Sequence, residues 1–193
     1  KIHSLTDDDP LATYLQLNLG GRNVCFQLFN TAWISELHEQ PGHLCMPINL
    51  IADNPILGAD LYVSLAHHPL HWLNADNMVA FRNILRKSSD IVLWGHEHLT
   101  DGITQKGDAW NLISLEGREL QDRNDPQNSA FAMYIINKEM DSLRSVIFSW
   151  KGESYELASE TDFSLERNAA QSSHSLYPNK ETLEELNDYG ALI

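Results

Sequence analysis

The stretches DLYVSLAHHP (residues 60–69) and DIVLWGHEH (residues 90–98) decide the fold of this chain. Each begins with an apolar run of strand length and ends abruptly in histidines. Between them, residues 77–87 carry apolar side chains at helical spacing, with Asn74 or Asp76 as the expected N-cap. The order strand, helix, strand over about 35 residues predicts a crossover that joins two parallel strands.

The histidines that follow both strands indicate a shared site. Five of the nine histidines lie between residues 67 and 98. Parallel strands end at the same edge of a sheet, and this is the edge where open α/β sheets bind ligands. In extended backbone, His96 and His98 would point to the same side, and Glu97 would point away. Gly95 allows a sharp turn and a close approach of the backbone. Neutral imidazole is a common ligand of zinc, iron and manganese, so this edge is a candidate metal site.

The flanking sequence predicts mainly strands. Residues 11–19 and 24–29 are expected to form a hairpin around Gly20-Gly21, followed by a loop over 30–42 and a short helix over 47–57. Further strands are expected at residues 110–115, 130–137, 142–150 and 154–157. From Ser159 the chain becomes polar and acidic and ends in an expected short helix over 179–189. The domain organisation predicted is therefore a folded part, 1–158, and a polar tail, 159–193.

Composition excludes several classes of protein. The chain has 193 residues, with 27 acidic and 13 basic side chains and a formal net charge of −14. This acidity argues against long nucleic acid and anionic membranes as partners. No apolar stretch approaches the roughly 20 residues that span a bilayer. The two cysteines, Cys25 and Cys45, are too few for a disulfide scaffold, and they favour a reduced, cytoplasmic protein.

The His-His-Pro stretch (67–69) and the Gly-His-Glu-His stretch (95–98), at this spacing, resemble the C-terminal motifs of calcineurin-like metallophosphoesterases. The resemblance extends more weakly over residues 11–158. It implies an α/β fold in which a two-sheet β-sandwich is flanked by helices, of which this chain would form the C-terminal half. It also implies metal-dependent hydrolysis of a phosphoester, as a phosphatase or phosphodiesterase.

The resemblance also implies a role for each histidine. His67 and His96 would bind one metal ion, and His98 would bind a second. His68 would act in catalysis from beside the metals. The cofactors implied are two divalent ions, such as manganese, iron or zinc, which generate a bridging hydroxide that attacks the phosphorus. His71 and Trp72 would border the substrate pocket, although packing of Trp72 on the following helix explains that residue equally well.

The N-terminal motifs of that family, which carry the aspartates and an Asn-His pair, do not occur in this sequence. Three imidazoles supply no negative charge to hold two repelling cations together. We therefore expect the chain to be inactive by itself. The missing half would lie either earlier in a longer polypeptide or in a partner chain. The expected substrate is a phosphoester of mono- or dinucleotide size.

Two other classes of function remain open from the sequence. A non-catalytic interaction or regulatory module would retain the fold and use the acidic tail, with Leu183 and Leu186 on one helix face, to bind a partner. A structural zinc domain ranks last because the cysteines are few.

Overall fold

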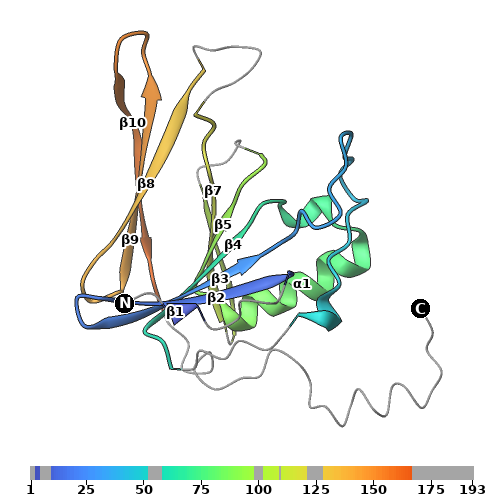
Figure 1. Ribbon diagram of the computed structural model, residues 1–193. Coiled ribbons are helices and arrows are strands. Elements are labelled where there is room, and N and C mark those ends of the chain that lie inside the picture. The colour runs from blue at the N-terminus through green and yellow to red at the C-terminus, as the bar shows by residue number, and fades with distance from the viewer. Residues whose placement is uncertain are drawn as a thin grey trace, which may run out of the picture.

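A seven-stranded mixed sheet forms the centre of the molecule (Figure 1). The computed structural model describes residues 3–4, 10–51, 58–97, 102–108, 110–120 and 128–166. The strands of this sheet lie in the order β1-β2-β3-β4-β5-β7-β6. Their bounds are β1 His3–Ser4, β2 Ala12–Leu19, β3 Arg22–Phe29, β4 Leu61–Ala66, β5 Ile91–Trp94, β6 Ile103–Gly107 and β7 Trp110–Glu116.

The predicted crossover is confirmed. β4 and β5 pair in parallel, with Ala66 opposite Trp94, and the helix α1 (Ala75–Ser88) joins them. The Asn74 side chain accepts a hydrogen bond from the Asn77 backbone N–H, so Asn74 is the N-cap of this helix. The buried residues of α1 are Phe81, Ile84 and Leu85. β3 and β7 also run parallel to this pair, so four strand ends meet at one edge of the sheet.

The expected hairpin over residues 11–29 is also confirmed. β2 and β3 pair antiparallel through a two-residue turn in which Gly20 and Gly21 both have positive φ, 60° and 87°. This backbone conformation is open to glycine without strain, which explains why two glycines stand here.

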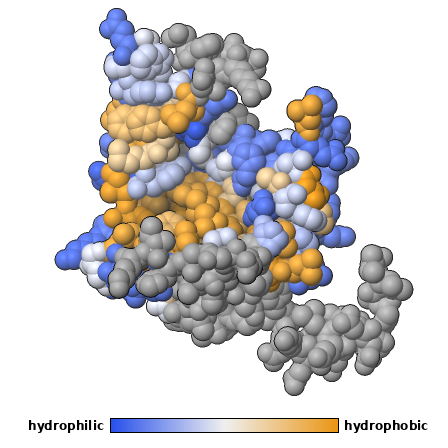
Figure 2. All heavy atoms as spheres, viewed as in Figure 1, coloured by the Kyte–Doolittle hydropathy of each residue, from blue (hydrophilic) through white to orange (hydrophobic). Residues whose placement is uncertain are grey.

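A second sheet of three antiparallel strands packs on one face of the first. Its order is β10-β9-β8, with bounds β8 Ala130–Ile136, β9 Ser142–Trp150 and β10 Tyr155–Ser164. Leu143 and Phe163 of this sheet share a buried cluster with Val63 and Ile91 of the central sheet. Figure 2 shows apolar atoms gathered where the two sheets meet.

The opposite face of the central sheet is covered by α1 and by the long segment between β3 and β4. The buried side chains here include Tyr14, Phe29, Met46 and Phe81. The Phe29 and Phe81 rings meet edge to face, with 5.2 Å between their centroids. None of the helices in the described ranges is long and apolar enough to cross a membrane.

The structure differs from the local sequence predictions in three places. Within the expected helix 47–57, the described part holds only a short 3₁₀ turn, η1 (Ile48–Leu50), and residues 52–57 lie outside the described residues. The strand expected to end at residue 157 continues to Ser164, because Phe163 and then Leu165 are buried against the other sheet. β6 was not predicted, because its side chains are mostly exposed and show no alternation of apolar and polar residues. The helix expected over 179–189 lies outside the described residues.

Candidate functional site

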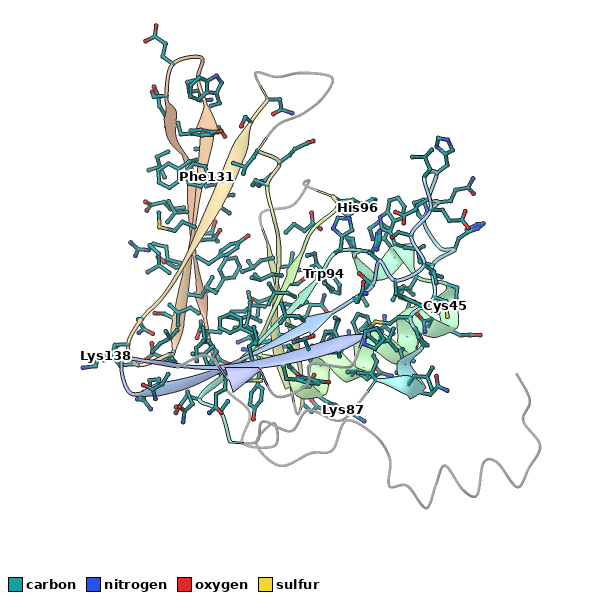
Figure 3. All side chains as sticks on the ribbon, in the orientation of Figure 1. Cys45, Lys87, Trp94, His96, Phe131 and Lys138 are labelled. Atoms are coloured by element: carbon teal, nitrogen blue, oxygen red, sulfur yellow. The ribbon has the colours of Figure 1, made fainter. Side chains whose placement is uncertain are left out.

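The candidate site lies at the edge of the central sheet where β4 and β5 end. His67 directly follows β4, and His96 follows β5 after a single glycine. The Gly95 N–H donates to the Ala66 carbonyl at 3.1 Å, which continues the pairing of the two strands past their ends. Parallel pairing in this register therefore sets the two histidines side by side. In Figure 3, His96 stands beyond Trp94 at this end of the sheet.

Three imidazoles gather at this edge. His67 Nε2 and His96 Nδ1 lie 3.1 Å apart, and the two rings are nearly perpendicular. The His68 ring packs against both, with centroid distances of 4.6 Å to His67 and 4.7 Å to His96. One ring nitrogen from each of the three lies within 4.8 Å of the others. This group is the only one in the described residues that could hold a metal ion, and it contains no carboxylate.

The backbone at His96 is not extended, contrary to the sequence prediction. Its φ is 64°, in the left-handed region that non-glycine residues seldom adopt. The Glu97 N–H bonds back to the Gly95 carbonyl at 2.8 Å, which closes a tight turn around His96. Gly95 makes this turn compatible with the neighbouring strand, because a Cβ there would come within 3.0 Å of His67 Nδ1.

His68 is completely buried, and its backbone N–H and both of its ring nitrogens have protein partners. Its backbone N–H donates to Thr31 Oγ1 at 2.9 Å. Its Nδ1 lies 3.2 Å from the Thr31 carbonyl oxygen, and its Nε2 lies 2.9 Å from Glu39 Oε2. Both ring nitrogens therefore contact protein groups, so the catalytic role expected for His68 stays a prediction.

Glu39 comes from the long segment after β3, and its side chain is only 11% exposed. The Ser35 side chain is the largest influence on the pKa of the Glu39 carboxyl and lowers it. Burial raises this pKa, and the hydrogen bond and charge of His68 lower it again, so that the net pKa lies below 4.5. The carboxyl is therefore ionised at neutral pH.

Glu97 is turned toward the site and not away from it as predicted. Its Oε1 accepts hydrogen bonds from Trp72 Nε1 at 2.8 Å and lies 2.9 Å from His71 Nε2. Burial is the largest influence on the pKa of Glu97 and raises it. The bonds from Trp72 and His71, together with the charges of His71 and His96, outweigh burial and lower the pKa. Glu97 thus ties the segment after β4 to the segment after β5.

Of the two roles that the sequence left open for Trp72, packing is confirmed, and a place beside a substrate stays a prediction. Trp72 is half-buried and packs against the core cluster beneath α1. Its ring also stands edge-on to the His96 ring, with 4.2 Å between centroids. His71 is exposed, at the side of Trp72.

A pocket of about 640 Å³ opens beside His67 and Gly95. Leu28, Leu65 and Leu93, near the ends of three parallel strands, form an apolar part of its lining. Its volume falls in the usual range of about 300–1,000 Å³ for small-molecule sites. His67, one member of the His67–His96 pair, is therefore part of the pocket wall.

The structure places the sequence-predicted residues unequally. It brings His67, His68, His96 and Trp72 together, whereas His98 lies outside the described residues. Thr31 and Glu39 were not predicted. They contact His68 from 37 and 29 residues earlier in the chain, in a segment without periodicity that could have pointed to them.

No protein-family model matches the chain, and no curated protein matches it.

Proposed function

We propose that this chain supplies the histidine half of the metal centre of a calcineurin-like metallophosphoesterase, which hydrolyses a phosphoester. The observation that carries the proposal is the 3.1 Å separation of His67 Nε2 and His96 Nδ1 at the edge where parallel strands end. The mixed α/β architecture with two packed sheets is compatible with the sandwich of that family.

The donor set suits a divalent transition metal. Two imidazole nitrogens 3.1 Å apart have the spacing of ligands that share one ion at metal–nitrogen distances of about 2.0–2.1 Å. Imidazole favours zinc, iron and manganese over calcium. The same distance also suits a hydrogen bond between two imidazoles, and a metal titration distinguishes the two.

The chain's own residues would hold and orient such an ion. His67 and His96 would donate nitrogen, with His98 proposed as the ligand of a second ion. When bound, divalent ions would activate water and polarise the phosphoryl oxygens. Trp72 shields one side of His96, and the pocket beside His67 offers room for a phosphoester of mono- or dinucleotide size.

We expect the described residues to form half of a site. The carboxylates of Glu39 and Glu97, which lie around the imidazoles, contact His68, Trp72 and His71. Two ions close together need negative ligands between them, because their Coulomb repulsion is large. We therefore expect a single ion to bind the chain weakly, and we expect catalysis to require carboxylates from another segment or a partner chain.

The first test is a calorimetric titration of the full chain with Zn²⁺ and Mn²⁺. The wild type should bind, and His67→Ala and His96→Ala should each lose at least about tenfold in affinity. The control is His38→Ala, which alters an exposed histidine away from the cluster. Equal affinity in all four proteins would contradict the proposed ligands.

The second test is turnover of bis(p-nitrophenyl) phosphate with Mn²⁺. We expect none from this chain alone. Robust turnover that His96→Ala abolishes would show that the chain holds a complete centre and that the half-site argument is wrong.

A non-catalytic module is the second candidate. The observation in its favour is that the described histidine group lacks a carboxylate. The Zn²⁺ titration separates the two candidates, because binding that His67→Ala and His96→Ala weaken favours the hydrolase, and no binding by the wild type favours the module.

A further inference from the structure

The hydrogen bonds of His68 distinguish it from the other two histidines. The Thr31 carbonyl oxygen can only accept, so Nδ1 must donate to it. Its Nε2 lies 2.9 Å from Glu39 Oε2. His68 therefore lies within ligand distance of its neighbours, but both of its ring nitrogens already contact other protein groups.

We propose that Glu39 is a positioning residue that acts through His68 and holds the His67–His96 pair in its metal-binding arrangement. This inference rests on the proposed function. Glu39 and Thr31 clamp the buried His68 ring from two sides, and that ring packs against both members of the pair. His67 directly precedes His68 in the chain, so a change in the orientation of His68 reaches the proposed metal ligand directly.

The burial of the clamp makes this coupling rigid. His68 is fully buried, and the Glu39 side chain is nearly so. When a buried hydrogen bond loses one partner, the other is left unsatisfied, and this costs free energy. Outer groups that orient metal-binding histidines typically change metal affinity by about 10–100-fold when they are removed. The segment between β3 and β4 thus controls the site although it supplies no ligand.

The decisive spectroscopic test is ¹⁵N NMR of the imidazoles in the wild-type chain, with and without Zn²⁺. The His68 nitrogens should keep the same chemical shifts before and after addition of Zn²⁺, while His67 Nε2 and His96 Nδ1 should shift as ligands. A ligand-type shift at His68 would overturn the inference. Because this experiment needs no variant, it remains decisive if a substitution prevents folding.

The matching affinity test compares Glu39→Gln with Glu36→Gln, which alters an exposed carboxylate on the same segment. Glu39→Gln should weaken Zn²⁺ binding by at least about tenfold, and Glu36→Gln should leave it unchanged. If the wild type binds Zn²⁺ and Glu39→Gln binds it equally well, only this inference fails. If the wild type does not bind Zn²⁺ at all, the proposed function fails and this inference fails with it.

Discussion

At the scale of single residues, the turn Gly95-His96-Glu97 decides the geometry of the candidate site. The left-handed backbone of His96 costs roughly 1–2 kcal/mol relative to a helical conformation. The structure offsets this cost with the Glu97 N–H bond to Gly95 and with the contacts of the Glu97 carboxylate. Strain retained next to a cluster of imidazoles is typical of a functional position.

Gly95→Ala tests this close approach. The new methyl group would lie 3.0 Å from His67 Nδ1, so the His67 ring must move by a few tenths of an ångström. We expect Zn²⁺ affinity to fall by roughly tenfold, or about 1.4 kcal/mol, in a calorimetric titration. The control is Gly117→Ala, where the nearest atom would be the Trp94 carbonyl oxygen at 3.4 Å. Unchanged affinity in Gly95→Ala would show that the position of the His67 ring does not limit binding.

At the scale of elements, the unit β4–α1–β5 places the site. The strands fix the register of His67 and His96, and α1 covers the apolar face beneath them. The start of α1 is set by Asn74, which follows the segment that carries His71 and Trp72. The Asn74 N–H also bonds to the Leu44 carbonyl, so the helix start is tied to the segment after β3.

Asn74→Ala should destabilise the protein by about 1 kcal/mol, because it removes the acceptor for the Asn77 N–H. In a chain of this size the melting temperature should fall by roughly 2–4 °C. Asn74→Asp, which retains an N-cap acceptor, should unfold like the wild type. Asn83→Ala, an exposed position in the body of the helix, should unfold at the same temperature or slightly higher. A melting temperature for Asn74→Ala equal to that of the wild type would show that the cap does not stabilise the helix.

At the scale of the whole molecule, two partly buried carboxylates tie together the three segments that follow β3, β4 and β5. Glu39 joins the first to the second through His68, and Glu97 joins the third to the second through Trp72. The Trp72 carbonyl also accepts from Gly42 and Leu44 at 3.1 and 3.0 Å. The site is therefore a meeting point of segments and does not belong to one motif.

This arrangement predicts acid sensitivity. The pKa values of Glu39 and Glu97 are lowered in the folded state, so the unfolded chain binds more protons as the pH falls. Their stabilising contribution is complete above their ordinary pKa of about 4.5 and disappears as the pH falls through the lower folded values. We expect urea unfolding, measured between about pH 3 and about pH 7, to give a lower free energy of unfolding at the acid end of this range.

The double variant Glu39→Gln/Glu97→Gln isolates this contribution from the other carboxylates. Its free energy of unfolding should be lower at neutral pH and should fall less steeply below about pH 4.5 than that of the wild type. Glu36→Gln, which changes an exposed carboxylate, should follow the wild-type curve. If the free energy of unfolding falls equally steeply with pH in the double variant and in the wild type, Glu39 and Glu97 do not cause the acid sensitivity.

Three features could be predicted from the sequence: the hairpin around Gly20-Gly21, the parallel crossover, and the sheet edge at which His67 and His96 meet. Each follows from a local rule: glycines at positive φ, apolar periodicity, and the common direction of parallel strands. The sequence did not reveal that the polar residues up to Ser164 form a strand. Their pairing with β9 and the burial of Phe163 override a composition that resembles coil.

The three imidazoles differ in the partners of their ring nitrogens, and these partners come together only in the folded chain. The partners of His68 and Trp72 lie 29 and 25 residues away in the chain, and no local pattern encodes which side chains will meet across such separations. The left-handed turn at His96 is likewise held by contacts that exist only when β4 and β5 lie side by side. Local periodicity therefore determines which residues reach the sheet edge, and packing between distant segments determines which of their ring nitrogens are held by other protein groups.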